Sequence, residues 1–374
     1  MSAADEVRAP LPDVSAAPLL SVSDLRVEYP TEDGLVVAVD SMDLDVAPGE
    51  VHCVVGESGC GKSQTARAVL GLLDPPGRIA AGSIRWREED GSVTDLTTLK
   101  PRGSVMRRIR GGQIGMIFQE PARSMSPMHT VGFQISESLR LHRGLDRRTA
   151  RNEAVALLEA VHVPKAALRA KSYPFELSGG MRQRAMIAVA LAGRPRLLIA
   201  DEPTTALDVT TQAQILELLR EIRDERDMAM VFITHDLGVV ADIADRTTVM
   251  YLGQAVETTD VFGLFERPVH PYTRSLMRSM PLLGRRENTL ATISGTVPSP
   301  LERPAGCLFH TRCPVVREGL CDVNEPMMRL LPEVTEAVQA GSADHRLRCV
   351  RAEEILAGEI TVRTTSGQEG AKDG

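Results

Sequence analysis

The chain contains the stretch Gly56-Glu57-Ser58-Gly59-Cys60-Gly61-Lys62-Ser63, which fits the pattern G-x-x-x-x-G-K-S. An apolar run of strand length, residues 51–55, precedes it, and Ala66, Val69, Leu70 and Leu73 follow it at helical spacing. Glycines let successive backbone N–H groups turn towards a phosphate chain, and a helix N-terminus adds its positive dipole end. The stretch therefore predicts a strand, a phosphate-binding loop and a helix, rather than a Gly-rich turn that binds nothing. In this prediction Lys62 contacts the β- and γ-phosphates and the Ser63 hydroxyl ligates Mg²⁺.

The composition indicates an ordinary globular protein. The 374 residues are 43% hydrophobic and 25% charged, with a net charge of −7, enough for one large domain plus a smaller one or for two ordinary domains. Residues 1–18 are polar and lack the apolar core of a signal peptide, so we expect a disordered lead-in. Since no apolar run approaches the roughly 18–20 residues that span a bilayer, we expect a cytoplasmic protein that reaches a membrane only through partners. The mild acidity disfavours nucleic acid as its main partner.

Alternating and apolar segments predict two kinds of sheet. Residues 19–29 and 35–46 alternate, which indicates antiparallel strands joined by a turn at 32–34, and residues 78–96 add further strands. Residues 114–118, 197–200 and 230–234 are apolar strands, with a long helical region at about 122–190 and an amphipathic helix around 215–222. This alternation predicts a parallel sheet with helices on both faces. After about residue 256 we expect Pro-rich, irregular chain, and after 357 a disordered tail.

Acidic residues follow one of these strands directly. Asp201 and Glu202 end the strand 197–200, and His235 follows the strand 230–234. Two adjacent acids are usually a solvated strand end and a lone histidine is usually structural, but ligands bind at this edge of open α/β sheets. We therefore expect Asp201 to organise Mg²⁺ through water, Glu202 to polarise the attacking water, and His235 to donate to the γ-phosphate.

A second anion-binding helix start is predicted at L-S-G-G-M-R-Q, residues 177–183. Ser178 has the side chain of an N-cap residue, and Gly179 and Gly180 expose backbone N–H groups ahead of the helix. Because this surface is separate from the first loop, we expect each chain to contact the nucleotide held by another.

These motifs together resemble ABC ATPases. L-S-G-G-M-R-Q lies between the phosphate loop and L-L-I-A-D-E-P at 197–203. The resemblance also includes Tyr29 as the aromatic that stacks on adenine, Gln119 in I-F-Q-E-P, Asp208 in A-L-D and His235 in T-H-D. It covers about residues 19–350. It implies an α/β, ABC-type P-loop NTPase fold: a nucleotide-binding domain over 19–256, made of a RecA-like core, an antiparallel β subdomain and a helical subdomain at about 120–190.

The resemblance also implies an assembly. Two such domains clamp two ATP molecules head to tail, so that residues 56–63 of one face Ser178, Gly179 and Gly180 of the other. Asp208 and Tyr29 belong to the same nucleotide site, and Gln119 contacts Mg²⁺, senses the γ-phosphate and passes closure on to a membrane subunit. Closure assembles the site and hydrolysis releases it.

Finer motifs are similar to those of oligopeptide/dipeptide importer ATPases: V-G-E-S-G-C-G-K-S at 55–63, H-P-Y-T at 270–273 and V-P-S-P-L-E-R-P-A-G-C at 297–307. They imply a C-terminal extension of that type over 257–357 and a tail at 358–374. The implied partners are a second, non-identical ATPase subunit, two transmembrane permease subunits and an extracytoplasmic substrate-binding protein. The chain itself would lie peripherally on the cytoplasmic face of the cell membrane. With Met at position 181, the motif resembles that of the first of the two ATPase subunits.

Two alternatives remain at this point. The same motor carries nickel or another small solute in similar systems, and the cargo is chosen by other subunits. A soluble ABC ATPase acting on nucleic acid or ribosomes is disfavoured, because the chain has neither a long coiled-coil insertion nor a second cassette.

Four cysteines gather in the C-terminal region: Cys307, Cys313, Cys321 and Cys349. Their spacing lacks the paired knuckles of structural zinc sites, and four thiolates on irregular chain favour an iron–sulfur cluster. Zinc and free thiols remain alternatives, since four-cysteine sites hold either metal. The resemblance implies a 4Fe–4S cluster, and we expect it to staple a segment that has little core.

Overall fold

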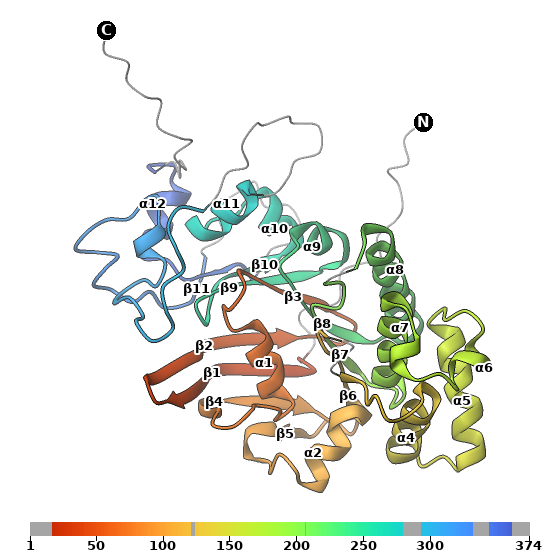
Figure 1. The fold of residues 1–374 in the computed structure, drawn as a ribbon. Coiled ribbons are helices and arrows are strands. Elements are labelled where there is room, and N and C mark those ends of the chain that lie inside the picture. Colours follow the sequence, from red (N-terminus) through yellow and green to blue (C-terminus); the bar gives the residue numbers. More distant parts are fainter. Residues whose placement is uncertain (1–16, 121–123, 206, 280–292, 332–343, 361–374) are drawn as a thin grey trace, which may run out of the picture.

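The computed structural model describes residues 17–120, 124–205, 207–279, 293–331 and 344–360. Two sheets organise this part of the chain (Figure 1). The four-stranded sheet has the order β2-β1-β4-β5 and the eight-stranded sheet the order β11-β12-β10-β9-β3-β8-β7-β6. The predicted lead-in and tail lie almost wholly outside the described residues.

The smaller sheet is antiparallel, as the alternating segments predicted. It consists of β1 (Leu20–Thr31), β2 (Gly34–Val46), β4 (Arg78–Arg87) and β5 (Val93–Asp95). β1 pairs with β2 from the Thr31–Gly34 pair at the predicted turn to the Leu20–Val46 pair at the far end. One face of this sheet is buried, and Trp86 near the end of β4 is fully buried.

The larger sheet is parallel through its centre. β6 (Ile114–Ile117), β7 (Leu197–Asp201), β8 (Ala229–Thr234), β3 (Val51–Val55) and β9 (Arg246–Tyr251) pair in parallel. Every residue of β7, β8 and β3 is buried. This burial explains why these strands read as continuous apolar runs, since both faces of the sheet are covered.

Successive residues of the central strands face opposite cores. In β7, Leu198 and Ala200 belong to the core under the helices, whereas Leu197 and Ile199 belong to the core under the antiparallel sheet. The sequence predicted helices on both faces, and both faces carry them. One face is covered by α7 (Gly179–Leu191), α8 (Val209–Arg226) and α9 (Leu237–Ile243), and the other by α1 (Lys62–Val69) together with the antiparallel sheet, which was not predicted to cover it.

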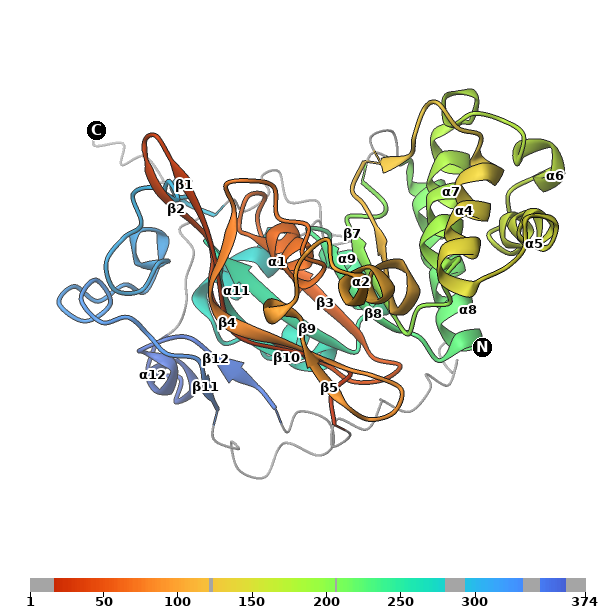
Figure 2. The ribbon, with the colours of Figure 1, turned by 90° about the horizontal axis from the view of Figure 1, so that it is seen from below.

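The helical region after β6 forms a group of its own beside the sheet. Both ribbon views place it on the side of the molecule opposite the C-terminal segment (Figures 1 and 2). Besides α7, this group holds α4 (Val131–Arg143), α5 (Arg147–Ala160), α6 (Ala166–Arg169) and η3 (Pro174–Glu176). The connection between β5 and β6 carries η1 (Leu96–Thr98), α2 (Ser104–Arg108) and the π-helical turn η2 (Ile109–Gln113).

The expectation of irregular chain after about residue 256 was wrong, because the residues that follow directly form a strand and two helices. β10 (Gln254–Asp260) pairs antiparallel with β9, and α10 (Val261–Glu266) and α11 (Pro271–Arg278) come next. Asp260 caps α10, and His270 caps α11 ahead of a proline at its first position. Proline is favoured there because its missing N–H is not needed, so it starts this helix rather than breaking it.

The remaining C-terminal segment joins the large sheet. β12 (Arg346–Leu347) pairs with β10, and β11 (Arg329–Leu330) pairs with β12 at the edge. The short helices η4 (His310–Arg312) and α12 (Ala352–Leu356) lie in the same segment. No helix within the described ranges has both the length and the apolar composition needed to cross a bilayer.

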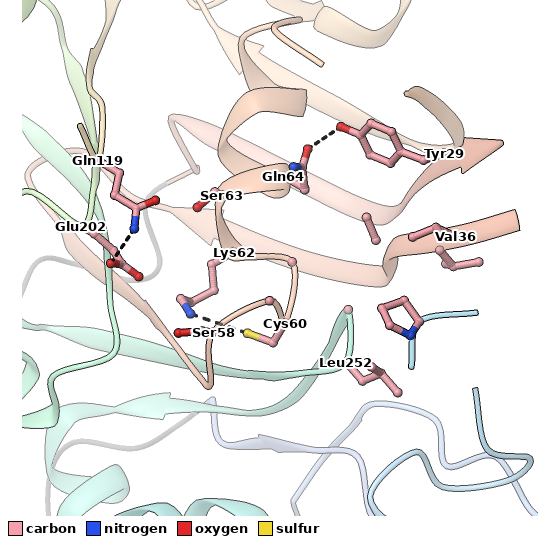
Figure 3. Close-up of a pocket in the computed structure, with 16 residues that line it drawn as sticks. Tyr29, Val36, Ser58, Cys60, Lys62, Ser63, Gln64, Gln119, Glu202 and Leu252 are labelled. Atoms are coloured by element: carbon pink, nitrogen blue, oxygen red, sulfur yellow. Dashed lines mark hydrogen bonds between the residues drawn. The ribbon is translucent and has the colours of Figure 1, made fainter. Parts of the chain in front are cut away.

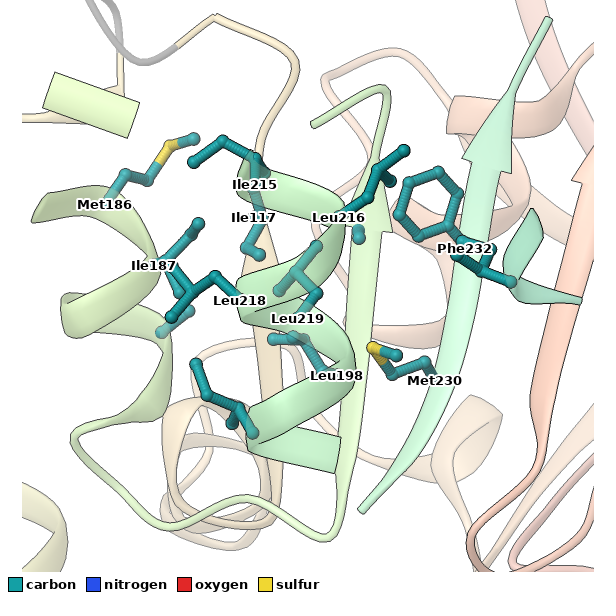
Figure 4. Packing of buried hydrophobic residues seen from close by; sticks show 14 of the residues in the cluster. Ile117, Met186, Ile187, Leu198, Ile215, Leu216, Leu218, Leu219, Met230 and Phe232 are labelled. Atoms are coloured by element: carbon teal, nitrogen blue, oxygen red, sulfur yellow. The ribbon is translucent and has the colours of Figure 1, made fainter. Parts of the chain in front are cut away.

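The core beneath α7 and α8 is closely packed (Figure 4). We expect Leu219→Ala, which removes a side chain that is 1% exposed, to lower the free energy of unfolding by about 2–5 kcal/mol, because it leaves a cavity. Val209→Ala on the same helix is the control: Val209 is 85% exposed, and its change should stay within about 0.5 kcal/mol. Denaturant unfolding measures both, and equal losses would contradict the assigned packing.

Candidate functional site

A cavity of about 400 Å³ opens where the parallel strands end, between the two sheets. Figure 3 shows its lining side chains converging from β1, β2, the phosphate loop, the chain directly after β6 and β7, and the β9–β10 turn. The lining residues are Tyr29, Val36, Val37, Ala38, Ser58, Gly59, Cys60, Gly61, Lys62, Ser63, Gln64, Gln119, Glu202, Leu252, Gly253 and Pro300.

The loop between β3 and α1 needs its glycines. Gly56 and Gly61 have φ of 155° and 100°, and a Cβ on them would lie 2.2 Å from the Met250 carbonyl oxygen and 2.3 Å from that of Ala38. No side chain caps α1, so the N–H groups of its first turn are available to an anion.

The Lys62 side chain is held by the backbone of this loop. Its buried Nζ donates to the carbonyl oxygens of Gly56 at 2.9 Å and Glu57 at 3.0 Å. An ammonium group held by two neutral carbonyls keeps its charge available for a phosphate, which is a stronger acceptor.

Ser63 lines the cavity and contacts Asp201, the buried last residue of β7, which does not line it. The Ser63 hydroxyl donates to Asp201 Oδ1 at 2.8 Å, although the two residues are 138 positions apart. Burial raises the pKa of the Asp201 carboxyl, an effect that the Ser63 hydrogen bond partly offsets. A hydroxyl and a carboxylate are oxygen ligands of the kind that Mg²⁺ prefers, so this pair fits the ion.

Glu202 is held by three side chains. Gln119 Nε2 donates to its Oε2 at 3.0 Å, Thr205 Oγ1 donates to the same oxygen at 2.8 Å, and His235 Nδ1 lies 3.4 Å from Oε1. Glu202 itself has φ of 47°, a strained conformation for a residue other than glycine. Thr205 was missed in the sequence, where it is one of two adjacent threonines without a distinguishing pattern.

The far end of the cavity is apolar. The Tyr29 ring lines it, with its hydroxyl donating to Gln64 at 2.5 Å, and burial raises the pKa of that hydroxyl. Leu252 and Pro300 complete this wall. Pro300 comes from the C-terminal segment, so sequence position alone gave no sign that it reaches the cavity.

Ser178, Gly179, Gly180 and Asp208 do not line the cavity. Ser178 caps α7 by accepting from the Met181 N–H at 3.3 Å, and Asp208 caps α8 by accepting from the Thr211 N–H at 2.9 Å. Ser178 and Gly179 are exposed. The predicted second helix start therefore exists, on a surface away from the chain's own cavity.

The C-terminal cysteines line a second, small cavity next to Phe309: Cys307, Cys313, Cys321 and Cys349. All four are free, and burial raises the pKa of Cys313 to about 12 and that of Cys349 to about 11. Among the described residues, no group of three or more His, Cys, Asp or Glu side chains is arranged to hold a metal ion. The predicted iron–sulfur site is thus represented only by four thiols around one space.

Two further residues that contact the phosphate loop were not identified from the sequence. Tyr272 and Arg312 of the C-terminal segment both contact Glu57 of the phosphate loop, at 3.0 Å and 2.7 Å respectively. The only sequence signals were the H-P-Y-T motif and the arginine directly before Cys313.

Comparisons with known proteins agree along the chain. Residues 39–205 match the family described as ABC transporter, and residues 256–321 match the one described as oligopeptide/dipeptide transporter, C-terminal region. A Brucella abortus (strain 2308) protein is 48% identical over 85% of this chain and 93% of its own length. A Brucella melitensis (biotype 1) protein is 48% identical over 92% of this chain and 100% of its own. Both carry the name "Putative peptide import ATP-binding protein".

Solved structures show the same architecture. The ATP-binding cassette MJ0796, in a dimeric post-hydrolysis state with ADP and Pi, is 25% identical, covering 65% of this chain and 98% of its own, with a TM-score of 0.57. For cbiO1 of Clostridium perfringens, part of the ABC transporter complex cbiONQ, the identity is 24% and the TM-score 0.55, covering 67% of this chain and 92% of that one. The fold of this chain is therefore that of an ABC-type P-loop NTPase.

Two glycines of the phosphate loop, Gly61 and Gly59, differ in the space that a Cβ would find, and this difference gives a stability test. Gly61→Ala should lower the melting temperature strongly, since its Cβ would collide with the Ala38 carbonyl. Gly59→Ala is the matched control: Gly59 has φ of 81°, but its Cβ would meet nothing within 4 Å. Gly59→Ala should lower the free energy of unfolding by only about 1–2 kcal/mol, the cost of a left-handed backbone conformation for alanine. Equal shifts in a thermal scan without nucleotide would contradict the close approach of β2 to the loop.

Proposed function

The chain belongs to the ATP-binding subunits of ABC transporters, and on this premise we propose that it hydrolyses ATP to power peptide import. The names of the relatives and the description of the C-terminal match support the peptide cargo. The observation that carries the ATPase activity is one cavity lined by the phosphate loop, with Ser63 bound to Asp201, and by the Gln119–Glu202 pair.

We propose that ATP lies along the cavity, with adenine at one end and the phosphates at the other. The Tyr29 ring offers a stacking surface for adenine at the apolar end, and the N–H groups of residues 58–63 offer donors to the phosphates at the other. Lys62 exchanges the loop carbonyls for the β- and γ-phosphates when nucleotide enters. Ser63, Gln119 and Asp201 would hold Mg²⁺, which supplies charge neutralisation at the phosphates.

Glu202 is proposed to orient and polarise the attacking water. Its carboxylate is fixed by Gln119 and Thr205, which leaves the oxygen nearer His235 to accept from water. His235 is proposed to donate to the γ-phosphate. Since little covalent chemistry is required of the protein in phosphoryl transfer, positioning of this kind is its main contribution.

A second ATPase chain is proposed to complete each site. Ser178, Gly179 and Gly180 begin α7 on an exposed surface, and Asp208 begins α8 nearby, where the Gly180 Cβ would lie 3.0 Å from Thr211. What supports this is that these groups do not line the cavity of their own chain. We propose that they face the phosphates held by a non-identical partner subunit.

The proposed assembly includes two transmembrane permease subunits and an extracytoplasmic substrate-binding protein. The ATPase would then lie peripherally on the cytoplasmic face of the membrane. The names of the relatives support this arrangement, because peptide import requires a path across the membrane.

The cysteine-lined cavity is proposed to hold a 4Fe–4S cluster. Such a cluster takes one thiolate per iron, so its ligands surround a group larger than a single ion. What supports this proposal is that four free thiols line one space and that Asp and Glu are absent from its lining. Among the described residues, one small hydrophobic cluster of this segment holds four buried side chains, Val269, Leu347, Ala352 and Ile355, and a bound 4Fe–4S cluster would add to its stability.

Glu202→Gln should abolish hydrolysis while ATP still binds. The amide keeps the size of the side chain but cannot polarise water, so turnover should fall by at least about 100-fold. ATP binding by calorimetry and phosphate release measure the two properties, with Glu159→Gln on the exposed face of α5 as the control. Normal turnover in Glu202→Gln would show that another group orients the water, and a wild-type chain that fails to bind ATP would overturn the proposal.

Cys313→Ser should remove iron and sulfide from anaerobically purified protein and lower its melting temperature. Cys53→Ala is the control, because Cys53 is buried in β3 away from the cysteine cavity and should leave the iron content unchanged. A wild-type chain that contains no iron and has the same melting temperature as the Cys313→Ser variant would contradict the proposed cluster.

A further inference from the structure

Glu57 of the phosphate loop is held at three of its polar groups. Its carbonyl oxygen accepts from Lys62 Nζ at 3.0 Å, and its N–H donates to the Tyr272 hydroxyl at 3.0 Å. Its carboxylate forms a two-point pair with Arg312, at 2.7 Å from Nη1 and 3.1 Å from Nη2. The same residue thus contacts the predicted phosphate-binding lysine on one side and the C-terminal segment on the other.

Arg312 is firmly placed. Its side chain is 3% exposed, its Nε donates to the Ser294 carbonyl at 3.1 Å, and its guanidinium lies 5.7 Å from the centre of the Tyr251 ring. Burial alone would lower the Arg312 pKa, but the hydrogen bonds and charge of Glu57 and the Tyr251 hydroxyl raise it. Arg312 therefore stays charged, and its planar fork fixes the direction of the Glu57 carboxylate.

Tyr272 is equally fixed. It is fully buried on α11, with its ring 4.9 Å from that of Tyr251 and 5.3 Å from that of Phe309. Burial raises the Tyr272 pKa well above its ordinary value, so the hydroxyl remains neutral and can accept from the Glu57 N–H.

We propose that Arg312 and Tyr272 are positioning residues that preform the phosphate loop, so that affinity for the phosphates of ATP depends on the C-terminal segment. This inference rests on the proposed ATP ligand. A loop whose N–H, carbonyl and carboxylate groups are already fixed loses less freedom when nucleotide binds. Arg312 also neutralises a carboxylate that belongs to the phosphate loop itself and that, unpaired, would oppose a polyanion.

Arg312→Gln should therefore weaken ATP binding by about tenfold, the equivalent of one hydrogen bond to a charged group. Binding of adenosine, which lacks phosphates, should not change. The KM for ATP should rise while kcat stays near wild type, the pattern expected when uniform binding is lost. Calorimetry with Mg²⁺–ATP and with adenosine, on the full chain, measures the binding, and thermal melting shows whether each variant is folded.

Three further variants separate this role from general destabilisation. Arg312→Lys should recover part of the lost affinity, because it keeps the charge but not the two-point geometry. The double variant Arg312→Gln with Glu57→Gln should bind ATP more tightly than Arg312→Gln alone, because the unpaired carboxylate is gone. Arg346→Gln is the matched control: Arg346 pairs with Asp344 at 2.6 Å in the same segment and does not line the cavity, so its loss should leave ATP affinity unchanged.

Glu57 is more exposed than Arg312, at 28%, so Glu57→Gln tests the same pair if Arg312→Gln does not fold. Wild-type ATP affinity in folded Arg312→Gln, or in Glu57→Gln when Arg312→Gln is unfolded, would overturn this inference and leave the proposed ATPase intact. An equal loss in Arg346→Gln would also overturn it. Absence of ATP binding by the wild-type chain would overturn the proposed function and this inference together.

Discussion

The close approach of three backbone segments at the phosphate loop is the constraint on which the site depends. The loop has room for no Cβ at Gly56 beside Met250 or at Gly61 beside Ala38, and the Gly253 N–H donates to the Cys60 carbonyl at 2.9 Å. These contacts hold the antiparallel sheet against the parallel one beside the phosphate loop. The cavity lies at this junction, which is why its walls come from both sheets.

The parts of the site that are local in sequence could be predicted. The apolar run of β3, the glycine spacing and the start of α1 are neighbours along the chain, and each follows from backbone sterics or periodicity. Asp201 and Glu202 were placed correctly beside the loop because parallel strands end at one edge of a sheet. Ser178 was correctly identified as a helix cap, since its side chain and the glycines after it act within one turn.

The parts that depend on distant contacts could not be predicted. Arg312 and Tyr272 reach Glu57 across 255 and 215 positions, and nothing in their own neighbourhoods indicates that target. Pro300 reaches the cavity in the same way. The helices after residue 256 were missed for another reason: the high proline content was taken as a sign of irregular chain, although one of these prolines, Pro271, starts α11.

The Glu57 contacts have a thermodynamic corollary. If anchoring the loop through Arg312 strengthens nucleotide binding, then bound nucleotide must strengthen the docking of the C-terminal segment by the same factor, because the coupling between two sites is reciprocal. Filling and emptying of the cavity would then tighten and loosen that segment in each cycle. A surface next to the cysteine cavity would thereby report the nucleotide state to whatever lies against it.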